Sequence, residues 1–309
     1  MTLQQLKYIG AIDDHKHFGR AAEACGLTQS TLSLLVRKLE EELDVRIFDR
    51  DAHPVAPTSI GRKVIDQARV VLFNAAQIPE MTRSEKQILS GPLHIGLIST
   101  VAPVLVPGIF SFISRHYPSI SLRTEEMLTD TIIDRLRKAD VDLGILSQPV
   151  GEPDLLEIPL YHERFYAYIS ERDPLYTRES FQADALLDQP IWIMKNGLRL
   201  FDRSQLAPGE DFSYERYFEG GRVGILIQIV NEIGGITIFP QTHLALLQGE
   251  LQKHLWPIEG AEPQRTIVLA VRKDFIHEAL LNVVVDAIRS IIPAVLLDPM
   301  VRGCRRLTL

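Results

Sequence analysis

The first 58 residues place apolar side chains three or four positions apart, the spacing that lines one face of an α-helix. Three such segments follow one another, near residues 3–12, 18–24 and 28–43. Gly26 supplies a turn between the second and third segments, and Thr28 is a favourable N-cap for the third. A helix, a turn with glycine and another helix make a helix-turn-helix, which places its second helix in the major groove of DNA.

The segment after the third helix has the features of a wing. Residues 45–50 alternate between apolar and charged side chains, as a short half-buried strand does. Pro54 and Pro57 then bound a loop that returns the chain. We therefore expect residues 1–58 to form a winged helix-turn-helix domain.

A longer helix is predicted to begin at Ser59, with Pro79 expected to end or kink it. Its apolar residues recur close to the coiled-coil spacing of about 3.5 residues. A helix of this kind usually packs against another copy, so residues 59–78 predict a homodimer, and residues 59–90 are assigned as linker helix and hinge. The residues of the apolar seam are Ile60, Val64, Ala68, Val71, Leu72, Ala75 and Ile78.

Beyond residue 90, short apolar strands alternate with amphipathic helices, which is typical of an α/β fold with parallel strands. Residues 91–309 should form two α/β subdomains, residues 91–163 with 268–309 and residues 164–267. Two crossings of the chain would join them around a cleft, as in periplasmic binding proteins. Strands are predicted at residues 93–98, 120–123, 141–146, 164–169, 191–194, 236–239 and 266–271, with helices ending near residue 117 and at 131–138 and 277–292.

The net charge of −7 is unevenly distributed. Residues 1–90 carry 12 basic and 12 acidic side chains, so the whole excess of negative charge lies in the C-terminal part. A DNA-binding domain needs basic side chains to neutralise phosphates. A neutral N-terminal part with local basic clusters is compatible with that role.

The two cysteines, Cys25 and Cys304, lie in different predicted units, so they predict neither a disulfide framework nor a zinc site. Cys25 is expected to be a small buried hydrophobe. The chain also has no stretch near the roughly 18 apolar residues of a membrane span, and no signal-peptide pattern at its start. These features predict a cytoplasmic protein that does not associate with membranes.

The sequence contains no recognisable nucleophile elbow, phosphate loop, dinucleotide fingerprint or His/carboxylate metal cluster. We therefore expect no enzyme, no catalytic residue, no metal and no cofactor. A solute-binding protein would share the two-subdomain fold, but it would need an export signal and no helix-turn-helix. This chain has the opposite combination.

Several motifs follow one another in a fixed order along the chain, at residues 18–23, 27–33, 39–43, 48–50, 58–61, 93–100, 140–145 and 235–240. Through these motifs the sequence specifically resembles the LysR-type transcriptional regulators. The similarity covers nearly the whole chain, and within the family the sequence most resembles the OxyR group of peroxide sensors. The resemblance implies a DNA-binding transcription regulator whose activity changes when a small ligand enters the effector-domain cleft.

One departure from the peroxide sensors concerns the mechanism. Those members carry a reactive cysteine in a Gly-His-Cys-Leu-Arg stretch, whereas residues 194–200 here read Met-Lys-Asn-Gly-Leu-Arg-Leu, and no cysteine lies between Cys25 and Cys304. Because a thiolate is the nucleophile in such sensing, an intrachain disulfide switch cannot form. The alternative function is an OxyR-like oxidative-stress regulator that responds to peroxide without that switch.

In the DNA-binding interpretation, the start of the third helix presents short polar groups to base edges, while two later cations meet phosphate or guanine. Three further residues would hold the DNA backbone. The alternative is that these side chains only cap and solvate a small helical domain. The candidate DNA-binding residues are Gln29, Ser30, Thr31, Ser33, Arg37 and Lys38 in the helix, with Arg50, His53 and Arg62 at the backbone.

The candidate effector site lies where strands of the α/β region end, since backbone N–H groups there favour anions. Its hydroxyls and arginines favour a small carboxylate-bearing ligand. The alternative is that Thr100 caps its helix and that the arginines form surface ion pairs. Ser99 and Thr100 lie at such a strand end, and the resemblance to the LysR-type regulators places Thr129 and Arg265 around the same cleft. The opposite wall would be formed by Gly197, Leu198 and Arg199, and Arg222 occupies a helix start where many relatives have Ser or Thr.

The expected partners follow from these assignments. They are double-stranded DNA containing a promoter palindrome, the small-molecule effector, and further copies of the chain in a homodimer that associates into a homotetramer. RNA polymerase is a further candidate partner.

Overall fold

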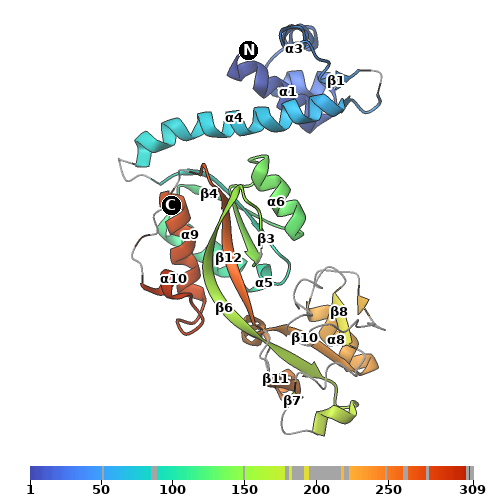
Figure 1. Ribbon diagram of the computed structural model, residues 1–309, viewed down its shortest axis with the longest axis vertical. Coiled ribbons are helices and arrows are strands. Elements are labelled where there is room, and N and C mark those ends of the chain that lie inside the picture. The colour runs from blue at the N-terminus through green and yellow to red at the C-terminus, as the bar shows by residue number, and fades with distance from the viewer. Residues whose placement is uncertain are drawn as a thin grey trace. The chain divides into compact units, whose positions relative to one another are not determined.

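A computed structural model describes the chain, and its internal contacts divide the protein into two units (Figure 1). The first comprises Met1–Ile88 with Ile133–Val141, and the second Leu89–Ile132 with Asp142–Leu309. The described residues are 1–50, 52–84, 89–148, 150–177, 181–182, 191–194, 217–218, 223–247, 249–259, 264–275, 278–303 and 306.

The helix-turn-helix begins with α1 (Leu3–His15), α2 (Phe18–Ala24) and α3 (Gln29–Leu43), close to the predicted segments. Each helix has a capping side chain that satisfies free backbone N–H groups. The Thr31 N–H donates to the Thr28 hydroxyl at 3.2 Å, which confirms Thr28 as the N-cap of α3. Fully buried apolar side chains join the three helices, among them Ile9, Ile12, Leu32 and Leu39.

The wing is a two-stranded antiparallel pair of β1 (Phe48–Asp49) and β2 (Ala56–Pro57). It is shorter than the strand predicted at residues 45–50 for a local reason. The backbone N–H groups of Ile47 and Phe48 donate to the Glu40 carboxylate, at 2.8 and 3.3 Å. These donors therefore bond to a helix side chain rather than to a neighbouring strand.

The linker helix α4 extends over Ser59–Ser84. Of the two outcomes expected at Pro79, an end of the helix is wrong, because the helix continues for more than one turn beyond that residue, and a kink stays a prediction. At its start, α4 lies so close to the wing that a Cβ on Gly61 would come within 1.9 Å of the Ile47 carbonyl oxygen. Only glycine fits this approach.

The predicted apolar seam of α4 has two kinds of residue. Ala68 is buried and belongs to the core of the helix-turn-helix, and Val64, Val71 and Leu72 pack against that core. Ile60 and Ile78, in contrast, are 46% and 65% exposed. The middle of the seam therefore stabilises the domain of its own chain, while its ends remain accessible.

The second unit is built on a mixed sheet with strand order β4-β3-β5-β12-β6-β10-β8-β9, in which β11 also pairs with β6, and β7 pairs with β11. The parallel pairing of β3 with β4 and with β5 was predicted, but β12 and β10 run antiparallel to β6. The strands are β3 (Gly91–Leu97), β4 (Ile120–Glu126), β5 (Leu143–Ser147), β6 (Leu155–Ile169), β7 (Phe181–Gln182), β8 (Ile191–Met194), β9 (Tyr217–Phe218), β10 (Ile236–Pro240), β11 (Leu255–Glu259) and β12 (Gln264–Arg272).

Helices and strands of the second unit together confirm the α/β architecture expected from the sequence. The largest parts of it that were not predicted are the helix α8 and the first half of the long strand β6. In β6, Leu160 is an extra residue where the register with β12 shifts, since Tyr161 pairs with Ile267 and Pro159 with Val268. The helices are α5 (Ala102–His116), α6 (Thr129–Arg137), α8 (Val223–Ile233), α9 (Glu278–Ile291) and α10 (Pro299–Gly303), with short 3₁₀ turns at η1 (Pro174–Thr177), η4 (Gln241–Leu246) and η5 (Gly249–His254).

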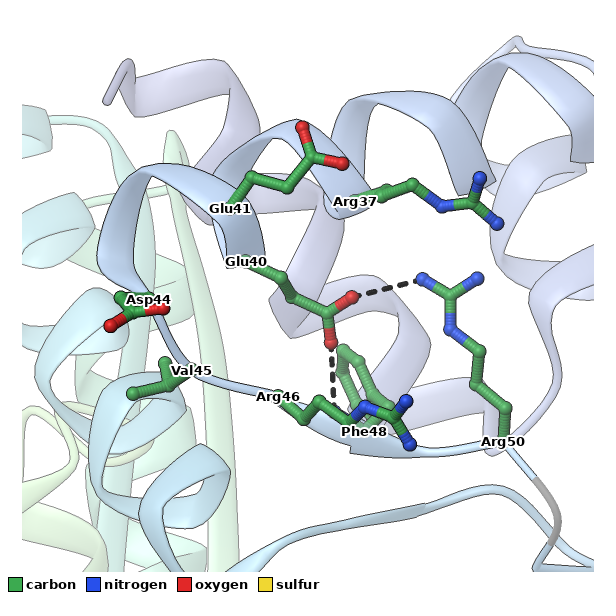
Figure 2. A pocket seen from close by; sticks show the side chains of 8 residues that line it. All are labelled: Arg37, Glu40, Glu41, Asp44, Val45, Arg46, Phe48 and Arg50. Atoms are coloured by element: carbon green, nitrogen blue, oxygen red, sulfur yellow. Dashed lines mark hydrogen bonds and ion pairs between the residues drawn. The ribbon is translucent and has the colours of Figure 1, made fainter.

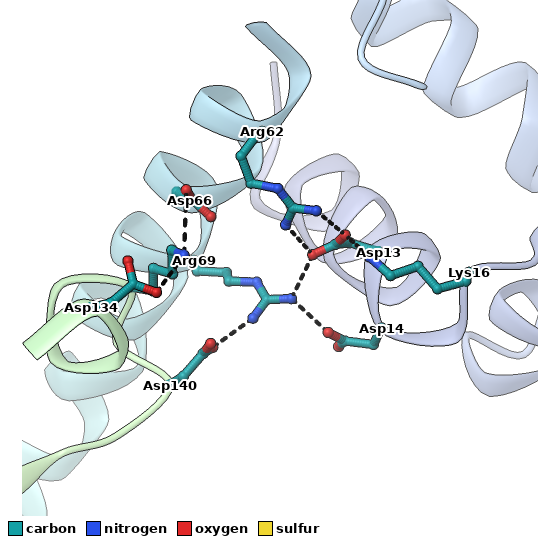
Figure 3. Close-up of polar contacts among 9 residues, drawn as sticks. Asp13, Asp14, Lys16, Arg62, Asp66, Arg69, Asp134 and Asp140 are labelled. Carbon is teal, nitrogen blue, oxygen red and sulfur yellow. Dashed lines mark hydrogen bonds and ion pairs between the residues drawn. The ribbon is translucent and has the colours of Figure 1, made fainter. Parts of the chain in front are cut away.

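Asp13 organises a network of ion pairs in the first unit (Figure 3). Its carboxylate is 5% exposed and accepts two hydrogen bonds from Arg62, at 2.8 and 3.0 Å, and others from Lys16 and Arg69. Arg69 also donates to Asp14 at 2.6 Å and to Asp140 at 2.7 Å. The network thereby joins α1 to α4 and to residues 133–141.

The environment of Asp13 changes its acidity. Burial raises the pKa of this carboxyl, but hydrogen bonds and positive charge from Arg62 and Lys16 outweigh that effect. The pKa of Asp13 is therefore held below its ordinary value of 3.8. The stabilisation is complete above pH 3.8 and is lost as the pH falls through the lower folded-state pKa.

The Asp13→Asn variant should destabilise the first unit by about 2–3 kcal/mol, since it removes charge-assisted hydrogen bonds to a buried carboxylate. Amide hydrogen exchange in α1 and α4 would measure the loss, and the difference from wild type should shrink below pH 3.8. Asp14→Asn is the matched control, because Asp14 is 63% exposed and should cost less than about 1 kcal/mol. Equal effects of the two variants would contradict Asp13 as the centre of the network.

Candidate nucleic-acid interface and effector site

The N-terminal part of α3 presents the polar side chains that were predicted to meet DNA. Gln29, Ser30 and Thr31 are exposed, and the Thr28 hydroxyl lies 3.0 Å from that of Ser30 and 2.8 Å from that of Thr31. Capping therefore orders this end of the helix while leaving polar groups at its surface.

One face of α3 continues this polar surface. Gln29, Ser33 and Arg37 follow one another at intervals of four residues, so they lie along the same side of the helix. Arg37 and its neighbour Lys38 are exposed, and Ser33 is half-buried. Gln29, Ser33 and Arg37 therefore share one side of α3, whereas Thr31 and Lys38 lie at other angles around the helix.

A hollow of about 690 Å³ lies between the C-terminal part of α3 and the wing (Figure 2). Figure 2 shows the guanidinium groups of Arg37, Arg46 and Arg50 on one side of it and the carboxylates of Glu41 and Asp44 on the other. Arg46, which sequence reasoning did not select, is exposed. The lining residues are Arg37, Glu40, Glu41, Asp44, Val45, Arg46, Phe48 and Arg50.

The three residues predicted at the DNA backbone differ in their surroundings. The Arg50 guanidinium donates to Glu40 at 2.9 Å and lies 5.5 Å from the centre of the Phe18 ring, so it faces the domain. Arg62 is paired with Asp13. His53 is exposed, with its ring Nδ1 3.0 Å from the carbonyl oxygen of Ala52. Contacts of these three residues with DNA stay a prediction.

In the second unit, two predicted effector residues meet. Thr100 follows β3 and Arg265 lies in β12, yet the Arg265 guanidinium donates to the Thr100 hydroxyl at 2.9 Å. Both residues are buried, with exposed fractions of 3% and 6%. Ser99 and Thr129 are half-buried, and Thr129 begins α6, two residues before the helix start predicted at residue 131.

The remaining predicted effector residues, Gly197, Leu198, Arg199 and Arg222, lie outside the described residues. Cys304 lies outside them as well, whereas Cys25 is half-buried and packs against the core of the helix-turn-helix.

Glu163 is the residue of this site that sequence reasoning missed. It lies opposite Arg265 in the β6–β12 pair and is 1% exposed. Its carboxylate accepts from Arg265 Nε at 2.8 Å, and from the backbone N–H and hydroxyl of Thr242 at 3.1 and 2.6 Å. A glutamate within an apolar stretch was the available signal, because a buried charge requires a partner.

Two more buried groups lie near this ion pair. Tyr161 precedes Glu163 by two residues on the same face of β6, and His243 follows Thr242. Within the described part of the chain, neither the Tyr161 hydroxyl nor the His243 ring nitrogens have a hydrogen-bond partner. Burial, with help from the charge of Arg265, lowers the pKa of His243 to about 4. His243 is therefore neutral at pH 7, and the Glu163–Arg265 pair adds no net charge.

The Glu163→Gln variant should destabilise the second unit by about 3–5 kcal/mol, because Arg265 would remain buried without its counter-charge. Both tryptophans, Trp192 and Trp256, belong to this unit, so urea unfolding followed by tryptophan fluorescence isolates its stability. Replacing both partners, in Glu163→Gln/Arg265→Met, should recover more than half of the loss.

An exposed ion pair supplies the control for that measurement. Asp286 pairs with Arg289 three residues later and is 41% exposed, so Asp286→Asn should cost only about 0.5 kcal/mol. A similarly small cost for Glu163→Gln would refute the structural importance of the buried pair.

Comparison with known proteins assigns both units. The profile described as bacterial regulatory helix-turn-helix protein, lysR family, matches residues 3–62, and that of the LysR substrate binding domain matches residues 86–291. The chain belongs to the LysR family. It is a DNA-binding transcription regulator with an effector-binding domain, which confirms the function expected from the sequence.

Relatives of this LysR-family chain include named peroxide regulators. A hydrogen peroxide-inducible genes activator of Dickeya chrysanthemi is 32% identical over 279 residues, 88% of this chain and 90% of the relative. The DNA-binding transcriptional dual regulator OxyR of Escherichia coli is 30% identical over 293 residues, 94% and 95% of the two chains.

The solved structures show the same likeness. A full-length OxyR variant from Pseudomonas aeruginosa, in which aspartate replaces one cysteine, superposes with a TM-score of 0.81 at 30% identity, covering 97% of this chain and 98% of that one. The resemblance to the OxyR group is thereby confirmed. Among the described residues, no helix combines the length and apolar character that a membrane crossing requires.

Proposed function

We propose that the protein recognises an interrupted palindrome in promoter DNA through the exposed polar face at the start of α3. The ordered hydroxyls of this face and the exposed Arg37 four residues after Ser33 support this proposal. Short polar side chains suit base edges in the major groove, and arginine suits guanine or phosphate. Copies of the chain would bind the two half-sites.

Selection of genomic fragments by the purified protein tests this proposal. We expect one interrupted palindrome to be enriched, and we expect the enrichment to disappear for the Gln29→Ala/Arg37→Ala variant, which loses a polar contact and a cation of the proposed interface. Glu41→Gln serves as control, since Glu41 is exposed on a later turn of the same helix. Enrichment no greater than for random DNA would leave the recognition face without a function.

The proposed effector is a small molecule that binds near Thr100 and Arg265. The described part of this site has no net charge, because Glu163 balances Arg265 and His243 is neutral. It therefore favours a neutral ligand that both donates and accepts hydrogen bonds. The carboxylate-bearing effector stays a prediction that depends on Arg199 and Arg222.

A second candidate effector is hydrogen peroxide, which is a small neutral molecule of this kind. The names of the relatives favour it, as does the match between its chemistry and the neutral cluster. Thiol chemistry is not required for the proposed binding. The protein would then be an oxidative-stress regulator without an intrachain disulfide.

If peroxide is the effector, peroxide should change the DNase footprint of the wild-type chain, and the Cys25→Ser/Cys304→Ser variant should retain the whole change. Thr100→Val, which removes the hydroxyl bonded to Arg265, should abolish it. An unchanged wild-type footprint would exclude peroxide as effector. Loss of the peroxide-dependent footprint change in the Cys25→Ser/Cys304→Ser variant would instead show that a thiol takes part in sensing.

The proposed assembly and setting follow from the DNA-binding role. The exposed Ile60 and Ile78 support a homodimer through residues 59–78, and effector domains would join dimers into a tetramer. RNA polymerase is proposed as a partner at activated promoters. We propose that the protein acts in the cytoplasm, where its DNA lies, and that it controls transcription without catalysing a reaction.

A further inference from the structure

Glu40 connects the recognition helix to the wing. One carboxylate oxygen accepts from the backbone N–H groups of Ile47 and Phe48, and the other accepts from Arg50 at 2.9 Å. The Glu40 side chain is only 11% exposed. Figure 2 shows its two carboxylate oxygens directed toward the wing and toward Arg50. A single side chain of α3 therefore fixes both the backbone that leads into β1 and the arginine that follows β1.

Arg50 is held on the domain by three neighbours. Its charge is balanced by Glu40, its guanidinium lies over the Phe18 ring, and its second terminal nitrogen donates to the Ser33 hydroxyl oxygen at 3.3 Å. A guanidinium with these contacts is poorly placed to neutralise a DNA phosphate. Its position instead links it to a residue on the recognition face.

The contact with Arg50 decides how Ser33 can bond to DNA. A hydroxyl can donate one hydrogen bond and accept two. Since a cation already donates to the Ser33 oxygen, its remaining capacity is best used as a donor directed away from Arg50. Guanine, adenine and thymine each offer an acceptor in the major groove, whereas the cytosine edge offers an amino donor.

We propose that Glu40 and Arg50 are positioning residues for DNA recognition, which fix the wing on α3 and make Ser33 a hydrogen-bond donor. The base facing Ser33 is then one with an acceptor edge, and cytosine is disfavoured there. This inference rests on the proposed insertion of the α3 face into the major groove. It assigns specificity to two residues that themselves touch no base.

The test compares binding sites selected by the wild-type chain, Ser33→Ala, Arg50→Met and the double variant. Ser33→Ala and Arg50→Met should both relax discrimination against cytosine at one and the same position, by roughly fivefold, the lower end for one base contact. The double variant should relax it no further, because both changes remove one interaction. Relaxation at different positions, or additive effects, would overturn the proposal.

The salt dependence of DNA affinity separates positioning from a phosphate contact. Each lost phosphate contact reduces the slope of log K against log salt by about 0.9. The slope for Arg50→Met should equal that of wild type, and a reduction by about 0.9 would identify Arg50 as a phosphate contact instead. A merely structural role of Arg50 would leave the base preference unchanged.

Matched variants guard against loss of folding. Glu40→Gln should relax the same base position as Arg50→Met, whereas Glu41→Gln, next to it in α3 and exposed, should behave as wild type. If Arg50→Met does not fold, Arg50→Lys keeps the pair with Glu40 but lacks the planar fork that also reaches Ser33. Arg50→Lys should therefore fold and still relax the position.

The outcomes also distinguish this inference from the function on which it rests. If the wild-type chain enriches no palindrome, the proposed recognition face fails. If it enriches one, and Arg50→Met keeps the full discrimination at every position, only the positioning role fails.

Discussion

The buried ion pair between Glu163 and Arg265 constrains the second unit, because both charges are almost fully buried. It lies where β6 and β12 run side by side, and these two strands connect β5 on one side of the sheet to β10 on the other. Neither charge can lose its partner without a large penalty, because both side chains are almost fully buried. The pair therefore fixes how the two strands meet, and it removes the net charge that Arg265 would otherwise offer to a ligand.

Carboxylates have the same organising role in the first unit. Asp13 holds Arg62 and Lys16, and Glu40 holds Arg50 together with the start of the wing. Arg50 and Arg62, which the sequence predicted to contact DNA, therefore form ion pairs within the domain. The equal numbers of acidic and basic residues in the N-terminal part reflect this arrangement, since part of its positive charge is used internally. Arg37, Lys38 and Arg46 are among the cations that stay exposed.

Local signals explain what sequence could predict. The Thr28 hydroxyl caps α3 by accepting from the N–H of Thr31, only three residues later. The spacing of apolar residues likewise predicts the helices of the first 43 residues from short segments of sequence. The partners of buried charges lie much farther apart, as Glu163 and Arg265 do by 102 residues, and no local pattern joins them. The first half of β6 was missed because Pro159 and Glu157 are unusual in a strand. Its backbone pairs with β12, more than 100 residues later, and the Glu157 carboxylate accepts from the nearby Gly151 N–H.

These contacts also indicate how a ligand could act on a site without cysteine. A ligand shifts an equilibrium only if it binds one arrangement better than another. Near Arg265, a ligand that accepts a hydrogen bond can replace Thr100, whose neutral hydroxyl contributes about 1 kcal/mol, far more easily than it can replace the Glu163 carboxylate. Thr100 stands between β3 and α5, whereas Glu163 and Arg265 lie in the paired strands β6 and β12. If an effector binds at the proposed site, exchange of the Thr100 contact would therefore leave the two central strands joined and would change the segment between β3 and α5 first.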